Sequence, residues 1–211
     1  MDRQIPLELS GRETYAFQNF VIGESNRFAV TSLKNWRSWS SPVLLICGPE
    51  FCGKTHLLSA WAHENDGKLY SGDVQRDNRI GLDDANQYDE EVLFTLTNMA
   101  LNGHIEALVL TSRLMPSEWG VELPDLISRL SNIPAANISE PDDDILDAIL
   151  RKFFEDKGRV VSKDLVSYLL KSQDRSIPGL KSIVDALDLS ARETKRDLTR
   201  AFAANFLKSL D

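Results

Sequence analysis

The chain contains the stretch Gly48-Pro49-Glu50-Phe51-Cys52-Gly53-Lys54-Thr55. Its spacing, G-x-x-x-x-G-K-S/T, is typical of a loop that binds the phosphates of a nucleotide. In such a loop glycine lets backbone N–H groups turn toward a phosphate, the lysine reaches the β- and γ-phosphates, and the hydroxyl coordinates Mg²⁺. We therefore expect Thr55 to be a magnesium ligand. The expected nucleotide-binding residues of the loop are Gly48, Phe51, Cys52, Gly53, Lys54 and Thr55.

The segments on either side of this loop support the same interpretation. Residues 42–47 form a short apolar run, which predicts a buried strand, and residues 56–62 have the composition of a helix. A helix that begins at the loop would direct its positive end at the phosphate. The alternative is a degenerate loop that no longer binds a nucleotide.

Two aspartates and a threonine are candidates for chemistry on the bound nucleotide. A strand is predicted to end in Asp83 and Asp84. This resembles the Walker B arrangement, in which Asp83 would hold Mg²⁺ through water and Asp84 would orient the attacking water. Thr111, near the end of the most apolar run of the chain, could contact the γ-phosphate or that water. A solvated Asp-Asp turn is the alternative, because polar and glycine residues interrupt the strand before Asp83.

Strands and helices alternate through the first two thirds of the chain. The elements expected from the apolar spacing are a helix at 25–36, strands at 42–47, 67–71 and 79–84, a helix at 90–101, a strand at 107–112 and a helix at 123–130. This order predicts an α/β fold with a parallel sheet flanked by helices, and ligands bound at the carboxyl ends of the strands. In the first helix we expect Ser25 at the N-cap and Phe28, Ala29 and Leu33 on one face.

Only helical patterns follow residue 140. The expected helices are at 141–154, 163–170, 177–189 and 193–207. They predict a small all-helical lid domain beside the α/β domain. The expected organisation is a flexible segment at 1–14, a nucleotide-binding α/β domain at 15–139 and the lid domain at 140–211.

Composition excludes several classes of function. The formal net charge of −8 argues against a direct, non-specific grip on DNA or on an anionic membrane. No apolar window reaches the length of a membrane span, and we expect no signal peptide. Cys47 and Cys52 both lie at the phosphate loop, and we expect them to be free thiols in a reducing cytosol. The three histidines follow no metal-ligand spacing.

The N-terminus carries a short polar and apolar tag. Its sequence is Gln4-Ile5-Pro6-Leu7-Glu8-Leu9, followed by a segment without apolar spacing. The glutamine amide could hydrogen-bond a partner's backbone, while Leu7 and Leu9 could fill apolar pockets. A frayed terminus that docks on its own domain is the alternative.

Several motifs together resemble the AAA+ ATPases, and more narrowly their DnaA/Hda branch. Residues 20–29 are similar to the branch pattern F-V-x-G-x-S-N-x-x-A, and residues 53–58 match G-K-T-H-L-L. Residues 110–113 resemble the sensor I strand, and Arg129 falls where the branch carries its box VII arginine finger. The resemblance covers almost the whole chain. It implies binding of ADP or ATP with Mg²⁺, with further contacts to the nucleotide from Phe20, Val21, Ile22, Asn26 and His56.

The resemblance also implies partners. The tag is similar to the clamp-binding Q-L-x-L-x-L motif of the Hda subgroup, so Gln4, Ile5, Leu7 and Leu9 are expected to bind the β-subunit sliding clamp of DNA polymerase III. No helix-turn-helix domain follows the lid, so direct sequence-specific DNA binding is not expected. A bacterial, cytoplasmic adaptor close to the nucleoid and replisome is implied. It would use Arg129 in trans to promote hydrolysis of DnaA-bound ATP and so restrain replication initiation.

Two departures from the branch pattern bear on activity. Pro178 occupies the position of the sensor II arginine and cannot donate to a phosphate, while Arg175 lies three residues away. Asp84 stands where many AAA+ ATPases have glutamate, and its side chain is one methylene shorter. We therefore expect weak or no ATPase activity of the chain alone.

Other hypotheses share the phosphate loop. A helicase-loader ATPase acting on single-stranded DNA would need a basic channel face. A small-molecule kinase would need arginines over the transferred phosphate. A homodimer or a head-to-tail oligomer is also possible, because a free interfacial arginine could meet the phosphate loop of another copy.

Overall fold

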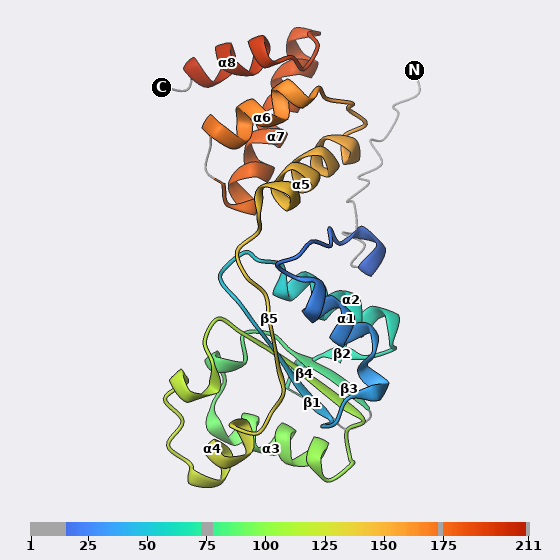
Figure 1. Ribbon diagram of the computed structural model, residues 1–211, viewed down its shortest axis with the longest axis vertical. Coiled ribbons are helices and arrows are strands. Elements are labelled where there is room, and N and C mark those ends of the chain that lie inside the picture. Colours follow the sequence, from blue (N-terminus) through green and yellow to red (C-terminus); the bar gives the residue numbers. More distant parts are fainter. Residues whose placement is uncertain (1–15, 73–77, 173–174, 210–211) are drawn as a thin grey trace, which may run out of the picture.

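The computed structural model describes residues 16–72, 78–172 and 175–209. The protein has two parts, an α/β part built on a sheet and a lid of four helices above it (Figure 1). The tag residues Gln4, Ile5, Leu7 and Leu9 lie outside the described residues. No helix among those described is long and apolar enough to cross a membrane.

Five parallel strands form one sheet in the order β2-β3-β4-β1-β5. β1 and β4 occupy the centre, and all their residues are buried, as expected for parallel strands covered on both faces. Because all strands run the same way, the segments that follow β1, β3 and β4 meet at one edge of the sheet. The strands are β1 Val43–Cys47, β2 Lys68–Leu69, β3 Arg79–Leu82, β4 Ala107–Ser112 and β5 Ala135–Asn137.

Helices cover both faces of the sheet. On one face α1 (Arg27–Lys34) and α2 (Lys54–Glu64) pack on Leu44 and Ile46 of β1 in one apolar core. On the other face α3 (Glu90–Leu101) and α4 (Pro124–Leu130) form a second core with the alternate residues of β1. Short 3-10 helices complete the part: η1 Phe17–Asn19, η2 Trp36–Ser38, η3 Ala85–Gln87 and η4 Pro116–Glu118.

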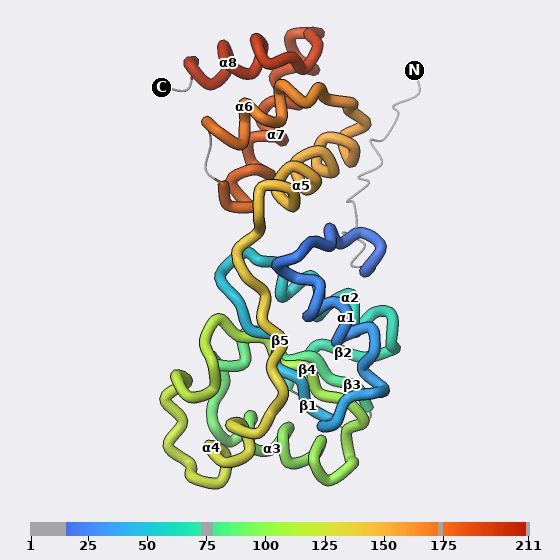
Figure 2. The backbone as a smooth tube through the Cα atoms, in the orientation of Figure 1, coloured from blue at the N-terminus to red at the C-terminus, as the bar shows by residue number. Residues whose placement is uncertain are grey.

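The lid has its own apolar core. Its helices are α5 Asp143–Asp156, α6 Lys163–Ser172, α7 Ile177–Thr194 and α8 Arg200–Lys208. Side chains from all four helices, among them Leu150, Leu169 and Leu187, are fully buried together. Figure 2 shows the chain rising from β5 directly into α5, so a single connection joins the sheet to the lid.

The expected α/β architecture is confirmed, and the differences lie in individual elements. The strand expected at 67–71 contains only the two exposed residues Lys68 and Leu69 at the sheet edge. The sequence gives no strand at Ala135–Asn137, yet this segment forms β5 beside β1. Its two alanines and one asparagine carry no β pattern, and the pairing with β1 decides its conformation.

Two helix boundaries were predicted wrongly. α1 begins at Arg27 with Asn26 rather than Ser25 at its cap, and Phe28 is 66% exposed although Ala29 and Leu33 are buried. The last helix begins at Arg200 instead of residue 193, because α7 continues to Thr194 and ends in a left-handed residue.

The buried carboxylate of Asp188 forms ion pairs within the lid. Asp188 on α7 is 5% exposed and accepts hydrogen bonds from Arg159 Nε and Arg192 Nε, both at 2.8 Å. Burial alone would raise the pKa of Asp188, but the hydrogen bond from Arg159 and the charge of Arg192 outweigh it and lower this pKa below its usual value. The ion pairs of Asp188 therefore stabilise the lid at pH values above the pKa of an aspartate in the unfolded chain.

We expect Asp188→Asn to lower the free energy of unfolding by about 1.5–3 kcal/mol at pH 7, the usual range for hydrogen bonds to a charged group. Because the folded pKa is depressed, this stabilisation is present above the unfolded pKa of about 3.9 and is lost as pH falls through the lower folded value. Urea denaturation at pH 7 and pH 3 measures the difference. Asp185→Asn, which removes the exposed pair with Lys157, is the matched control and should cost less. An equal loss at both pH values would contradict this account.

Candidate nucleotide site

The phosphate loop connects β1 to α2 and depends on glycine at two points. Gly53 has φ +97°, and a Cβ there would also lie 2.8 Å from the Phe20 ring. A Cβ on Gly48 would lie 2.6 Å from the carbonyl oxygen of Ile138. Phe51 adopts φ 61°, which is unusual for a side chain of its size. The loop therefore holds a tight conformation that other residues could adopt only with strain.

Lys54 begins α2 and directs its ammonium back into the loop. The side chain is buried, and Nζ donates to the carbonyl oxygens of Gly48 at 2.9 Å and Pro49 at 2.7 Å. A positive charge is thus held within the ring of backbone that the motif assigns to phosphate. Since the helix N-terminus adds its own partial positive charge, the loop favours an anion.

Thr55, Asp83 and Thr111 meet at the carboxyl edge of the sheet. The Thr55 hydroxyl donates to Asp83 Oδ2 at 2.8 Å, and the Thr111 hydroxyl donates to Asp83 Oδ1 at 2.5 Å. Thr111 in turn accepts from the backbone N–H of Asp84 at 2.9 Å. The structure therefore brings together three residues that the sequence selected from three separate segments.

This cluster contains the donor types that magnesium prefers. A hydroxyl and a carboxylate oxygen, Thr55 Oγ1 and Asp83 Oδ2, lie side by side next to the phosphate loop. No group of three or more histidine, cysteine or acidic side chains is arranged for a metal ion in the described part of the chain. The arrangement fits an ion that takes its remaining ligands from water and phosphate, as Mg²⁺ usually does.

Asp84 is held by its backbone in an uncommon conformation. Its φ is 46°, in the left-handed region, and its N–H is fixed by Thr111. A non-glycine residue there costs free energy and is maintained only by surrounding contacts. The turn after β3 thereby fixes the backbone position of Asp84.

An ion pair that no sequence pattern predicted joins the phosphate loop to the residue after β4. Arg113, directly after β4, donates from Nη1 and Nη2 to the two oxygens of Glu50, at 2.8 and 3.0 Å. Both side chains are about half exposed, 50% for Arg113 and 48% for Glu50. The partners are far apart in sequence, so no spacing pattern could have indicated the pair.

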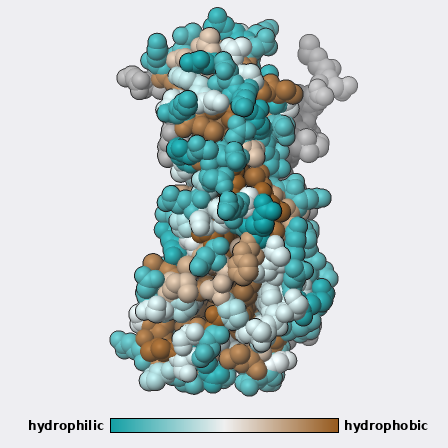
Figure 3. All heavy atoms as spheres, in the orientation of Figure 1, coloured by the Kyte–Doolittle hydropathy of each residue, from teal (hydrophilic) through white to brown (hydrophobic). Residues whose placement is uncertain are grey.

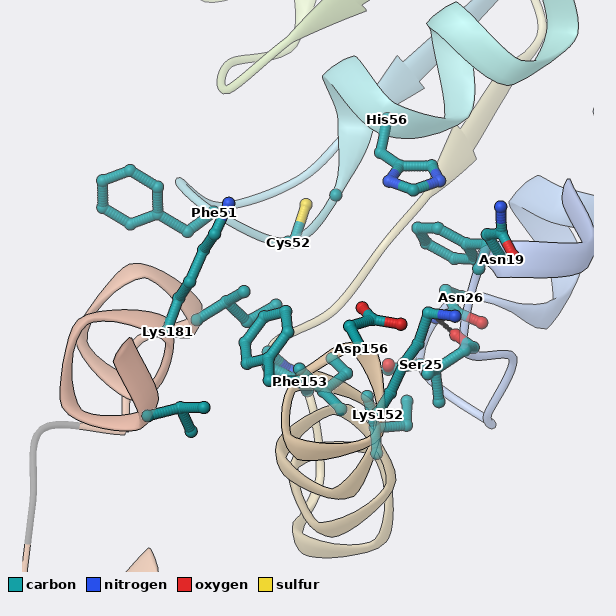
Figure 4. Close-up of a pocket in the computed structure, with 18 of the residues that line it drawn as sticks. Asn19, Ser25, Asn26, Phe51, Cys52, His56, Lys152, Phe153, Asp156 and Lys181 are labelled. Carbon is teal, nitrogen blue, oxygen red and sulfur yellow. Dashed lines mark hydrogen bonds between the residues drawn. The ribbon is translucent and has the colours of Figure 1, made fainter. Parts of the chain in front are cut away.

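A cavity of about 660 Å³ lies between the sheet part and the lid. Figure 4 shows side chains from residues 19–26, from the loop and from lid helices directed into it. The lid is in close contact here, because a Cβ on Gly23 would lie 2.4 Å from the side chain of Ile145 on α5. Of the residues expected to bind nucleotide, those that line the cavity are Phe20, Val21, Asn26, Phe51, Cys52, Gly53 and His56.

Two of the residues expected to bind the nucleotide, Ile22 and Asn26, differ from the others in their surroundings. Ile22 is 45% exposed and is not among the described residues that line the cavity. Asn26 is buried and uses its amide within its own turn, where Oδ1 accepts from Gly23 N–H and Nδ2 donates to the Val21 carbonyl, both at 3.0 Å. Asn26 therefore shapes the segment that borders the cavity. Gly48, Lys54 and Thr55 lie at the adjoining phosphate loop.

Both cysteines are buried free thiols next to the phosphate loop. Burial raises the pKa of Cys47 and of Cys52, although the nearby Lys54 charge opposes the shift in each case. The two thiols therefore stay protonated at neutral pH. This agrees with the expectation of unpaired cysteines.

Arg129 lies on α4, outside the cavity. Its guanidinium binds Asp125 one turn earlier, with Nη2–Oδ2 at 2.9 Å, and lies over the Phe94 ring at 5.4 Å from the centroid. At the lid, Pro178 is in the first turn of α7, and Arg175 is paired with Asp143. Neither arginine lines the cavity, whose lining residues all belong to the described part of the chain.

Comparison with known proteins finds similarity to DnaA. Residues 12–70 match the family model of the bacterial DnaA ATPase domain. An uncharacterized protein of Haemophilus influenzae is 26% identical, covering 98% of this chain and 99% of its own length. The chromosomal replication initiator protein DnaA of Wolinella succinogenes is also 26% identical, covering 92% of this chain and 52% of its own. The chain is therefore similar to DnaA over most of its length, and its fold is of the AAA+ type.

Solved structures of DnaA agree with this AAA+ fold. Domain III of Thermotoga maritima DnaA superposes with a TM-score of 0.75 at 20% identity, over 92% of this chain and 96% of that one. AMPPCP-bound DnaA from Aquifex aeolicus gives a TM-score of 0.68 at 21% identity, over 87% of this chain and 69% of that one. The DnaA-related chain spans about half the length of the Wolinella initiator that it matches.

Proposed function

We propose that this DnaA-related protein is a regulatory adaptor of the Hda type. It binds the sliding clamp through the tag, meets ATP-bound DnaA through its AAA+ face and promotes hydrolysis of the ATP that DnaA holds. The outcome is negative regulation of replication initiation in the bacterial cytoplasm, near the nucleoid and replisome.

The position of Arg129 is the observation that carries this proposal. Arg129 lies on α4, outside the cavity of its own chain, where its side chain is 28% exposed and paired with Asp125. At this position the Arg129 guanidinium does not contact the nucleotide of its own chain. It can instead act at the nucleotide site of a partner. Exchange of the exposed Asp125 pair for a phosphate would cost little, since surface pairs contribute weakly.

The surroundings of Arg129 also support a partner. Leu123 and Ile127, at the start of α4, are 42% and 47% exposed, and Leu114 and Met115 before η4 are 41% and 38% exposed. Hydrophobic atoms are visible at the lower left of Figure 3, over this part of the molecule. Exposed large apolar side chains around a cation are typical of a protein-binding surface.

The adaptor's own nucleotide would be ADP or ATP, held by the phosphate loop and the cavity, and Thr55 and Asp83 would hold Mg²⁺. When bound, the ion would neutralise phosphate charge. Asp84 and Thr111 would orient the attacking water. The short Asp84 side chain and the proline at the start of α7 favour slow turnover by the chain alone.

The net charge of −8 supports protein partners over direct DNA binding. A helicase loader that holds single-stranded DNA is the competing function. It would need a basic channel, and it makes no use of the N-terminal tag. Binding to the sliding clamp separates the two functions.

We expect the full chain to bind the β sliding clamp and Gln4→Ala/Leu7→Ala to weaken that binding at least about tenfold, the scale of losing an interface anchor. Surface plasmon resonance on immobilised clamp measures it. Glu8→Ala, a charged position between the two leucines, is the matched control and should bind normally. Absence of binding by the parent chain would remove the tag from the account and put the helicase loader first.

A further inference from the structure

Arg113 contacts the phosphate loop at two points. Its guanidinium donates to both carboxylate oxygens of Glu50, the third residue of the loop, at 2.8 and 3.0 Å. Its backbone carbonyl oxygen accepts from Cys47 Sγ at 3.7 Å, directly before the loop begins. A guanidinium that binds a carboxylate through two parallel hydrogen bonds fixes direction as well as distance. Arg113 therefore connects the loop to the end of β4 in a defined geometry.

The segment that carries Arg113 is itself held in place. Ser112, the last residue of β4, is fully buried. Its hydroxyl donates to Asn86 Oδ1 at 3.0 Å and accepts from the Leu114 N–H at 3.1 Å. Its carbonyl oxygen accepts from the Gly48 N–H at 3.2 Å. Because these contacts fix the backbone on both sides of Arg113, its side chain extends from a well-anchored part of the sheet.

The turn of the loop after Glu50 depends on contacts of this kind. Phe51 and Gly53 both have positive φ, 61° and 97°. A non-glycine residue in the left-handed region is held there by its surroundings. The Phe51 side chain contributes little to this, because it is 52% exposed. The ion pair of Glu50, directly before Phe51, is therefore a contact that can hold the turn.

The same ion pair offsets a negative charge at the loop. Lys54 Nζ donates to the carbonyl oxygen of Pro49 at 2.7 Å, and Glu50 is the next residue along the chain. An unpaired carboxylate there would repel the phosphates of a nucleotide and compete with them for the Lys54 ammonium. Arg113 binds both oxygens of this carboxylate and so counters its charge.

We propose that Arg113 is a positioning residue of the nucleotide site. Through Glu50 it holds the phosphate loop in the conformation that receives the phosphates of ADP or ATP, and it neutralises a carboxylate that would oppose them. Arg113 acts in this way without contacting the nucleotide. The inference rests on the nucleotide site of the proposed function and assigns the Glu50–Arg113 pair a part in it.

The test is the binding of the fluorescent nucleotide mant-ADP to the full chain in Mg²⁺, with its release started by excess unlabelled ADP. Arg113→Gln should bind about fivefold more weakly, the scale of a well-oriented ion pair at a half-exposed site, and should release mant-ADP faster. Glu50→Gln removes the carboxylate together with the pair. It should lose at most about twofold in affinity, because no unpaired charge remains at the loop.

The double variant Glu50→Gln/Arg113→Gln separates positioning from direct contact. With no carboxylate left to neutralise, the loss of Arg113 should cost nothing further, so the double variant should match Glu50→Gln. A double variant as weak as Arg113→Gln would indicate that Arg113 contacts the phosphates directly and would overturn the proposal. Parent-like affinity and release in Arg113→Gln would overturn it as well.

The opposite end of β4 offers a matched control. Glu106→Gln breaks the ion pair of Glu106 with Arg79, where Oε2 and Nη2 are 2.8 Å apart, and should leave affinity and release unchanged. Equal melting temperatures without nucleotide verify that the variants are folded. If the parent chain binds mant-ADP and Arg113→Gln behaves like it, this inference alone fails. A parent chain that does not bind mant-ADP would overturn the nucleotide site as well.

Discussion

We expect Lys54→Ala to lose measurable binding of ADP and ATP, and with it the stabilisation that these nucleotides should give the parent protein. The parent places the Lys54 ammonium inside the loop, within 2.9 Å of two backbone carbonyl oxygens, where the phosphates are expected. At a ligand concentration 100-fold above Kd, binding adds about 2.7 kcal/mol to the free energy of unfolding. For a chain of this size that corresponds to a rise in Tm of about 5–10 °C.

Differential scanning fluorimetry with and without ADP and Mg²⁺ measures this shift. Lys171→Ala, on the exposed side of α6, is a matched lysine control and should show the parent's shift. A shift of equal size in Lys54→Ala and the parent would remove Lys54 from nucleotide binding. Absence of a shift in every protein would indicate the degenerate loop considered above.

Arg129→Ala should fold normally and bind the clamp, yet lose the stimulation of ATP hydrolysis by DnaA. An arginine supplied in trans contributes about 10³–10⁵ in rate in fast phosphoryl-transfer systems. Inactivation of an initiator is a slow switch, so we expect an effect at or below the low end of that range. Single-turnover hydrolysis of ATP bound to DnaA, with loaded clamp present, measures the rate.

The lid offers a control for this substitution. Arg151 is also paired with an aspartate one turn earlier, Asp147, with Nε–Oδ2 at 2.6 Å. Arg151→Ala removes the same type of side chain and surface pair, and it should retain full stimulation. Asp125→Asn releases Arg129 without removing it and should also remain active. Stimulation by Arg129→Ala equal to that of the parent would exclude Arg129 from the mechanism.

The strongly patterned elements were predictable from the sequence. β1, β4 and α3 have the expected residues to within one position, because continuous apolar runs and helical spacing determine them locally. The meeting of Thr55, Asp83 and Thr111 was also predictable, since the carboxyl ends of parallel strands share one edge.

Features that depend on tertiary contact were not predictable. β5 consists of Ala135–Asn137 and is a strand only through its pairing with β1. The Glu50–Arg113 pair joins two loops distant in sequence. Asn26 lines the cavity, and its amide is hydrogen-bonded within the turn before α1, which no local pattern indicates. Local sequence patterns do not indicate which distant segments pair or which hydrogen-bond partner a side chain takes.

The most direct test of the central claim is the fate of ATP already bound to DnaA. Labelled ATP–DnaA is incubated with this chain, ADP and clamp loaded on DNA, and conversion to ADP–DnaA is followed after filter binding. We predict rapid conversion that requires both the chain and the clamp, with slow hydrolysis when either is omitted. Conversion at the rate of DnaA alone, with all components present and clamp binding verified, would contradict the adaptor function.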